Sequence, residues 1–117
     1  MRVAVCDDSR IDRELFVAVL HHYFVNKPIS NEIVQYENGM DLLHDVEDDM
    51  WFDIIFLDIY MNDLLGIDVA HKLRSLGYRG HIIFFTASSI HCRTCNKLEI
   101  PYQIKMLQYL LCKFFRL

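Results

Sequence analysis

Four short segments with the residue pattern of β-strands are spaced along the first three-quarters of the chain. They cover residues 2–6, 32–36, 54–57 and 81–85. The segment at 54–57 consists of consecutive apolar residues and stands between Asp53 and Asp58. A short apolar run of this kind is typical of a strand that is buried on both faces of a parallel sheet. We therefore expect this segment to be the central strand.

A helix is expected between the first two strands, because apolar residues recur there at helical spacing. Ser9 or Asp8 is a candidate for its N-cap, and the helix should end near residues 26–28, since Pro28 disfavours helical conformation in the residue before it. The residues expected on its buried face are Leu15, Phe16, Val19, Leu20 and Tyr23.

Two shorter helices are expected further along the chain. Residues 40–47 and residues 67–76 each place their apolar side chains on one side of a helix. Gly77 and Gly80 follow the second of these helices and are expected to close it, as glycines at helix C-termini do.

The last quarter of the chain departs from this regular pattern. Residues 90–96 have no apolar periodicity, residues 97–101 are expected to form a brief final strand, and residues 102–117 a closing amphipathic helix. Because strands and helices alternate along the chain, we expect residues 1–117 to form a single domain. The predicted class is a doubly wound α/β fold, with a parallel sheet and helices on both of its faces.

Composition and charge restrict the classes of function. The 117 residues are 53% hydrophobic, which is enough for one domain with its own core. The net charge of −4 and the lack of a basic patch argue against direct binding of nucleic acid by this chain. No apolar run reaches the length of a membrane span, and the N-terminus lacks the pattern of a signal peptide. The four cysteines do not make a disulfide framework, so we expect reduced thiols and a cytoplasmic protein without membrane contact.

Acidic residues directly follow the first strand and the central strand. Asp7 and Asp8 come after the first strand, and Asp58 comes after the central one. The carboxyl ends of the strands form the ligand-binding edge of an open α/β sheet, so two neighbouring strands would bring the three carboxylates together. Their repulsion is strong unless a cation lies among them, and hard divalent ions such as Mg²⁺ favour oxygen ligands. The sequence therefore predicts an acidic Mg²⁺ pocket at this edge.

Three motifs resemble those of the receiver domains of response regulators, which are the phospho-acceptor half of two-component signalling. Each motif stands at the end of an apolar run, and their order along the chain is that of the family. They are Val5-Cys6-Asp7-Asp8-Ser9, Asp58-Ile59-Tyr60-Met61 with Gly66 eight residues after Asp58, and Phe85-Thr86-Ala87-Ser88. The first two look most similar to the receivers of LytR/AlgR-type transcription regulators. The resemblance implies a flavodoxin-like sheet of five parallel strands and a signalling switch rather than an enzyme. It also implies a sensor histidine kinase as partner, and it leaves a homodimer open.

The resemblance also implies roles for individual residues. Asp58 is similar to the phospho-acceptor, whose carboxylate attacks the phosphohistidine of the kinase. Asp8, helped by Asp7 through water, would hold Mg²⁺ beside Asp58, and the backbone carbonyl of Tyr60 would complete the metal site. The ion would neutralise the phosphoryl oxygens during transfer. Thr86 resembles the switch hydroxyl that turns toward the phosphoryl group, and a glycine at the position of Gly66 permits the loop to return past the site.

The chain departs from the family pattern where a phosphate-pairing lysine is expected. In receivers this lysine precedes a proline after the fifth strand, whereas Ile100 precedes Pro101 in this chain. The interval from Thr86 to Pro101 is also short, so the fourth helix is expected to be shortened or irregular and residues 90–101 to be atypical. Other candidates for the lysine are Lys97, Lys105 and, in a second alignment that makes residues 108–113 the final strand, Lys113.

This departure affects switching more than phosphoryl acceptance. Without a cation near the phosphoryl oxygens, their electrostatic stabilisation is weaker, and the coupling of phosphorylation to Thr86 should weaken with it. One interpretation is that the C-terminal quarter is not ancestral sequence. No effector domain, such as a DNA-binding domain, is expected in residues 1–117.

Two other functions are compatible with parts of this pattern. A pseudo-receiver would act through protein contacts without useful phosphorylation. A Mg²⁺-dependent hydrolase of the haloacid dehalogenase type also uses an aspartate nucleophile, but it normally has a second aspartate two residues on, where Tyr60 stands. Cys92 and Cys95, with His91, have the spacing of zinc ligands, but no second pair follows, so a loop with free thiols is the simpler interpretation.

Overall fold

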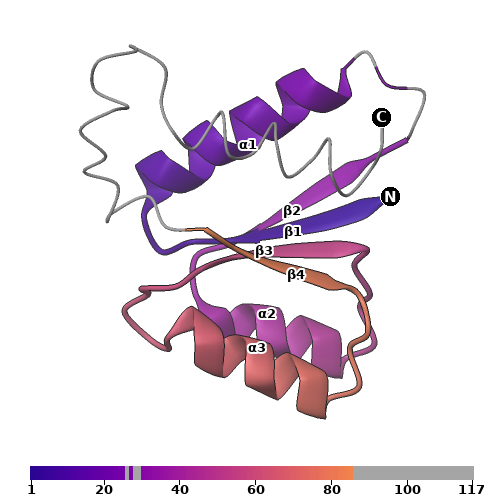
Figure 1. The fold of residues 1–117 in the computed structure, drawn as a ribbon. Coiled ribbons are helices and arrows are strands. Elements are labelled where there is room, and N and C mark those ends of the chain that lie inside the picture. The colour runs from indigo at the N-terminus through magenta and orange to yellow at the C-terminus, as the bar shows by residue number, and fades with distance from the viewer. Residues whose placement is uncertain (26, 28–29, 86–117) are drawn as a thin grey trace.

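The computed structural model describes residues 1–25, 27 and 30–85, which form a parallel sheet between two layers of helices (Figure 1). In chain order the elements are β1 (Arg2–Cys6), α1 (Arg10–Phe24), β2 (Glu32–Tyr36), α2 (Gly39–Glu47), β3 (Ile54–Asp58), α3 (Gly66–Ser75) and β4 (His81–Phe85). Strands and helices therefore alternate as the sequence predicts. No helix in this part of the chain combines the length and the apolar character of a membrane span. The expected final strand, the closing helix and the atypical residues 90–101 lie outside the described residues.

The order of the strands is β2-β1-β3-β4, and every neighbouring pair is parallel. Cys6, the last residue of β1, pairs with Tyr36 of β2 on one side and with Leu57 of β3 on the other. The carboxyl ends of β1 and β3 consequently lie side by side in the middle of the sheet. The predicted doubly wound α/β fold is confirmed, with four parallel strands in the described part of the chain.

Helices cover both faces of the sheet. α1 lies over one face, whereas α2 and α3 lie over the other (Figure 1). Because strand side chains alternate between faces, Val5 and Phe56 belong to the core beneath α1, and Ala4 and Leu57 belong to the core beneath α2 and α3. All five residues of β3 are buried, which confirms the prediction that this segment is the central strand.

The buried face of α1 differs from the predicted one. The buried residues of this helix are Arg13, Phe16, Val17, Leu20 and Phe24. Leu15 is 46% exposed, so its predicted burial is wrong, whereas Val19 and Tyr23 are partly buried and pack against the core. Apolar residues occupy two adjacent stripes of this helix, and the position of the sheet decides which of them is buried.

The N-cap of α1 is Ser9 rather than Asp8. The side-chain oxygen of Ser9 accepts a hydrogen bond from the backbone N–H of Asp12 at 3.4 Å. The helix ends at Phe24, with Val25 as its C-cap, close to the predicted end. The residue types near the first and last turns of α1 therefore predicted where this helix begins and ends.

The two glycines after α3 have different roles. Gly77 has a φ of +92°, a conformation that favours glycine, and it ends the helix as predicted. Gly80 does not close the helix, because it stands four residues beyond the C-cap Leu76; a Cβ there would overlap the phenol oxygen of Tyr78 and approach the backbone carbonyl of Phe52. The prediction is thus wrong for Gly80, which instead makes room for a buried ring.

Candidate metal centre

Three carboxylates gather at the carboxyl edge of the sheet. Asp58 is the last residue of β3, and Asp7 and Asp8 directly follow the neighbouring strand β1. One oxygen atom from each carboxylate lies within 4.8 Å of the other two. In the described part of the chain, no other group of three or more His, Cys, Asp or Glu side chains has this spacing. The predicted proximity of the three acids is therefore confirmed.

Asp7 is fully buried, and one of its side-chain oxygens has no hydrogen-bond partner among the described residues. Its backbone N–H donates to the carbonyl of Tyr36 at 3.1 Å, and its Oδ1 accepts from the backbone N–H of Ser9 at 2.9 Å. Oδ2 is buried and accepts no hydrogen bond from any described residue. Buried carboxylate oxygens are normally hydrogen-bonded or bound to a cation, so Oδ2 is suited to be a metal ligand.

The other two carboxylates contact the loop that follows β3. Oδ2 of Asp8 accepts from the backbone N–H of Asn62 at 2.8 Å, and Oδ1 of Asp58 accepts from the backbone N–H of Tyr60 at 3.4 Å. Asp58 is 4% exposed, and Asp8 is partly exposed. The side chain of Tyr60 is 60% exposed, so this residue contacts Asp58 through its backbone.

Burial and repulsion raise the pKa values of the two buried carboxyl groups. Burial raises the pKa of Asp7 to about 7, with an opposing contribution from the Ser9 N–H and a further rise from the Asp58 carboxylate. The pKa of Asp58 is also raised, chiefly by burial, against the backbone N–H of Tyr60. A divalent cation offsets both effects. The unpaired buried oxygen and a donor set made of carboxylates therefore fit Mg²⁺, which binds hard oxygen ligands.

Two further contacts hold the loop after β3, one beside the site and one at the start of α2. The backbone N–H of Gly66 donates to the carbonyl of Ile59 at 2.8 Å, and a Cβ at Gly66 would overlap the backbone carbonyl of Asp58. This close approach requires glycine, as expected for a loop that returns past the site. Oδ2 of Asp63 accepts from the backbone N–H of Gly39 at 2.9 Å, which ties the loop to the start of α2.

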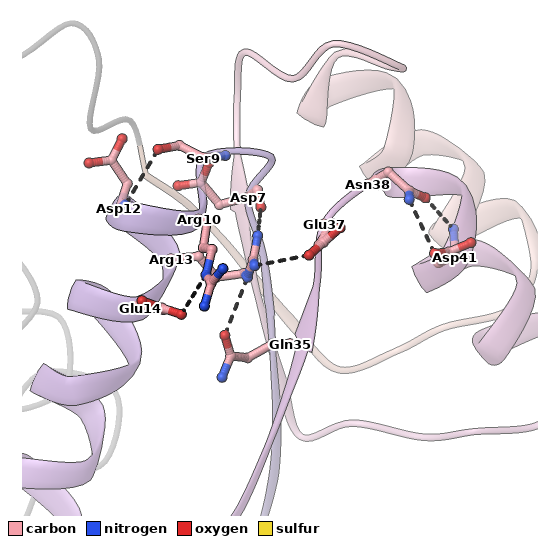
Figure 2. Close-up of polar contacts among 10 residues, drawn as sticks. All are labelled: Asp7, Ser9, Arg10, Asp12, Arg13, Glu14, Gln35, Glu37, Asn38 and Asp41. Atoms are coloured by element: carbon pink, nitrogen blue, oxygen red, sulfur yellow. Dashed lines mark hydrogen bonds and ion pairs between the residues drawn. The ribbon is translucent and has the colours of Figure 1, made fainter.

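A buried arginine lies next to the acidic residues, and the pattern of apolar residues in the sequence did not predict it. Arg13 of α1 is 5% exposed, and its Nη1 donates to the backbone carbonyl of Asp7 at 2.8 Å (Figure 2). It stands three residues before Phe16 and seven before Leu20, which is the spacing of the buried stripe. That spacing is the signal that could have identified it. A pattern counted over apolar residues passes over an arginine, because arginine is mostly exposed in proteins.

Part of the predicted site lies outside the described residues. Thr86, the predicted switch hydroxyl, directly follows β4, whose last residue Phe85 pairs with Asp58. The other predicted positions outside the described residues are Lys97, Ile100, Pro101, Lys105 and Lys113, together with His91, Cys92 and Cys95.

Sequence comparisons agree with the motifs. The family model described as response regulator receiver domain matches residues 3–108. The sensory transduction protein LytR of Staphylococcus haemolyticus is 33% identical over 107 residues, which cover 90% of this chain and 40% of that protein. LytR of Staphylococcus epidermidis is 36% identical over 87 residues, which cover 74% of this chain and 32% of that protein. The chain thus spans two fifths or less of the length of these two relatives.

Solved structures show the same architecture. The response regulatory domain of the mrkE protein from Klebsiella pneumoniae is 25% identical, with a TM-score of 0.71 over 99% of this chain and 96% of that chain. A chain in the structure of histidine kinase ThkA in complex with response regulator protein TrrA is 31% identical. Its TM-score is 0.62, over 78% of this chain and 72% of that chain.

Proposed function

Since the chain belongs to the response regulator receiver domain family, we propose that it is phosphorylated on Asp58 by a sensor histidine kinase and signals through changed protein contacts. One observation carries this proposal. Asp58 ends the central strand, is 4% exposed, and has carboxylate oxygens of Asp7 and Asp8 within 4.8 Å of its own. Three carboxylates this close repel one another unless a cation lies among them, and Mg²⁺ favours such oxygen ligands.

The chemistry proposed for Asp58 is nucleophilic attack by its carboxylate. One oxygen forms a bond to the phosphorus of the phosphohistidine, the P–N bond breaks, and the electron pair leaves with the histidine nitrogen. Asp7, Asp8 and Asp58, with the backbone carbonyl of Tyr60, would hold Mg²⁺. When bound, Mg²⁺ neutralises charge on the phosphoryl oxygens and on the carboxylates. The unpaired buried Oδ2 of Asp7 supports this assignment.

Phosphorylation by a small phosphodonor tests the function directly. With Mg²⁺ and acetyl phosphate, the wild-type chain should gain the mass of one phosphoryl group, whereas Asp58→Asn should gain none. EDTA should abolish the gain. Asp53→Asn is the matched control, because Asp53 stands at the opposite end of β3, where its Oδ2 accepts from the backbone N–H of Arg2 at 2.8 Å. Asparagine can accept the same hydrogen bond.

The same experiment can also give a negative result. A wild-type chain that is folded and binds neither a phosphoryl group nor beryllofluoride at Asp58 would contradict the proposal. Such a chain would instead have the properties of a pseudo-receiver that acts by protein contact alone.

We further propose Thr86 as the switch hydroxyl. The pairing of Phe85 with Asp58 brings the end of β4 beside the acceptor, which supports this role for the residue that follows. Thr86→Ala should still bind beryllofluoride, but the change in the amide NMR spectrum of β4 on binding should shrink. An undiminished spectral change in Thr86→Ala would contradict the assignment.

A further inference from the structure

The guanidinium of Arg13 donates to three acceptors on two segments of the chain, one after β1 and one formed by β2 and the residue after it (Figure 2). Nη1 donates to the backbone carbonyl of Asp7 at 2.8 Å, Nε to Oε1 of Gln35 at 3.3 Å, and Nη2 to Oε1 of Glu37 at 3.4 Å. Asp7 directly follows β1, Gln35 belongs to β2, and Glu37 directly follows β2. One side chain of α1 therefore connects the segments next to the acidic site.

The contact with Asp7 is the buried one of the three. The carbonyl involved belongs to the peptide bond between Asp7 and Asp8, and a peptide bond is planar. Holding this carbonyl therefore restricts the backbone from which both carboxylates project. The preceding peptide is held as well, because the backbone N–H of Asp7 donates to the carbonyl of Tyr36 at 3.1 Å.

An arginine at this position carries a cost of desolvation, and its charge disfavours a bound cation nearby. Arg13 shares the buried stripe of α1 with Phe16 and Leu20, where an apolar residue packs without desolvation of a charge. A positive charge near a bound Mg²⁺ repels the ion and weakens its binding. What arginine adds over other residues is a rigid planar group whose N–H donors reach several acceptors at once.

We propose that Arg13 is a positioning residue for the Mg²⁺ ligands. By holding the Asp7–Asp8 peptide, it orients both carboxylates toward Asp58 and so sets the affinity for the ion. This inference rests on the proposed function, because it requires that the three carboxylates bind Mg²⁺. Charge and positioning predict opposite results: removal of a nearby charge alone strengthens Mg²⁺ binding, whereas loss of positioning weakens it.

Calorimetric titration of the whole chain with Mg²⁺ tests the inference in three variants. Arg13→Met keeps an unbranched side chain but removes every donor, and Arg13→Lys keeps the charge and one donor group. Arg10→Met is the matched control, because Arg10 lies on the same helix with its side chain 79% exposed and donates to Glu14 at 2.9 Å. We expect the dissociation constant for Mg²⁺ to rise about tenfold in Arg13→Met, to rise less in Arg13→Lys, and to be unchanged in Arg10→Met.

Phosphorylation by acetyl phosphate provides a second readout that separates positioning from damage to the fold. The Mg²⁺ concentration for half-maximal rate should rise about tenfold in Arg13→Met, while the rate at saturating Mg²⁺ changes less than about threefold. A merely structural role would lower the unfolding temperature equally with and without Mg²⁺ and leave the affinity unchanged.

Unchanged or tighter Mg²⁺ binding by folded Arg13→Met overturns the inference. If Arg13→Met does not fold, Arg13→Lys decides, and wild-type affinity in that variant overturns the inference. A wild-type chain that does not bind Mg²⁺ overturns the proposed function together with this inference. Normal binding by the wild type with no effect of the Arg13 substitutions overturns this inference alone.

Discussion

Among the carboxyl groups of the described residues, that of Asp7 belongs to the most buried residue, with 0% exposure. It is buried, and its Oδ2 has no hydrogen-bond partner among the described residues. Its backbone is held from two sides, by the carbonyl of Tyr36 and by the guanidinium of Arg13. Because the carboxyl group cannot move away, the free energy of its ionisation depends on what lies beside it. The stability of the protein should therefore depend on both pH and metal.

The raised pKa of Asp7 makes the stability of the metal-free protein fall as pH rises. This carboxyl titrates near 3.8 when unfolded and near 7 when folded, so the folded state binds the proton more tightly. The resulting stabilisation is fully present below about pH 4 and is lost as the pH rises through 7. We expect this group to lower the free energy of unfolding in EDTA by up to about 4 kcal/mol across that range. Urea denaturation at several pH values measures it. Asp7→Asn should lack this component, and parallel profiles for the two proteins would refute the prediction.

Gly66 has a specific steric role beside the acidic site. A methyl group there would overlap the backbone carbonyl of Asp58, so Gly66→Ala should lower the free energy of unfolding by about 1–3 kcal/mol and weaken Mg²⁺ binding. Gly77→Ala is the control, because its Cβ would meet nothing within 4 Å and its φ of +92° costs about 1 kcal/mol through strain alone. Denaturation and Mg²⁺ titration measure both effects. Equal losses of Mg²⁺ affinity in the two variants would argue against a specific role of Gly66.

At the level of elements, α1 shows how a helix with two apolar stripes is placed. Phe16 stacks on Phe85 with 4.4 Å between ring centroids and meets Phe56 edge-on at 5.0 Å. These contacts bury the stripe that contains Phe16 and leave Leu15 at 46% exposure. The orientation of α1 that buries Phe16 also places the side chain of Arg13 at the end of β1. The packing of the aromatic residues and the position of the arginine are therefore coupled.

Matched truncations on α1 test which stripe is buried. Phe16→Ala removes a ring from the core and should cost about 3–5 kcal/mol, since the surrounding side chains cannot fill the cavity completely. Leu15→Ala removes a side chain of which nearly half is exposed, and it should cost less than about 1 kcal/mol. Thermal or urea unfolding of both variants measures the difference. Similar costs would mean that Leu15 is buried in solution.

For the whole molecule, the order of the strands creates the acidic site. β1 and β3 are neighbours, although Asp8 and Asp58 are 50 residues apart in the sequence. An ion bound between them would connect two strands of the sheet, and it would bind the folded state in preference to the unfolded chain. Metal binding and folding should consequently be linked.

Mg²⁺ should raise the unfolding temperature in a concentration-dependent manner. A ligand that binds the folded state stabilises it by about 2.7 kcal/mol at 100 times its dissociation constant. Asp8→Asn should lose most of this increase, because it removes the charge of a proposed Mg²⁺ ligand. Asp12→Asn, which neutralises the next acidic residue along the chain, should retain it. Calorimetry with Mg²⁺ or EDTA measures the increase, and an equal rise in Asp8→Asn and the wild type would count against a metal role for Asp8.

In residues 1–85, the sequence by itself determined the order of the described helices and strands and the place where the acidic residues gather. The apolar run that ends at Asp58 identified a buried central strand, because only a strand covered on both faces has no polar side. The acidic residues after β1 and β3 could then be placed together, because parallel strands end at one edge of the sheet. These features depend on neighbouring residues and on general rules of sheet topology, so one sequence suffices to predict them.

Only the tertiary structure decided which side chains meet across the fold. The acceptors of Arg13 include Gln35 and Glu37, which stand 22 and 24 residues away in the sequence. The choice between the two stripes of α1 depended on packing against Phe85, and the role of Gly80 depended on the ring of Tyr78. Such contacts follow from the free energy of packing segments that are distant in the sequence. Local periodicity can place Arg13 on the buried stripe of α1, but it does not say which distant segments this side chain meets, which is why its acceptors emerged only from the structure.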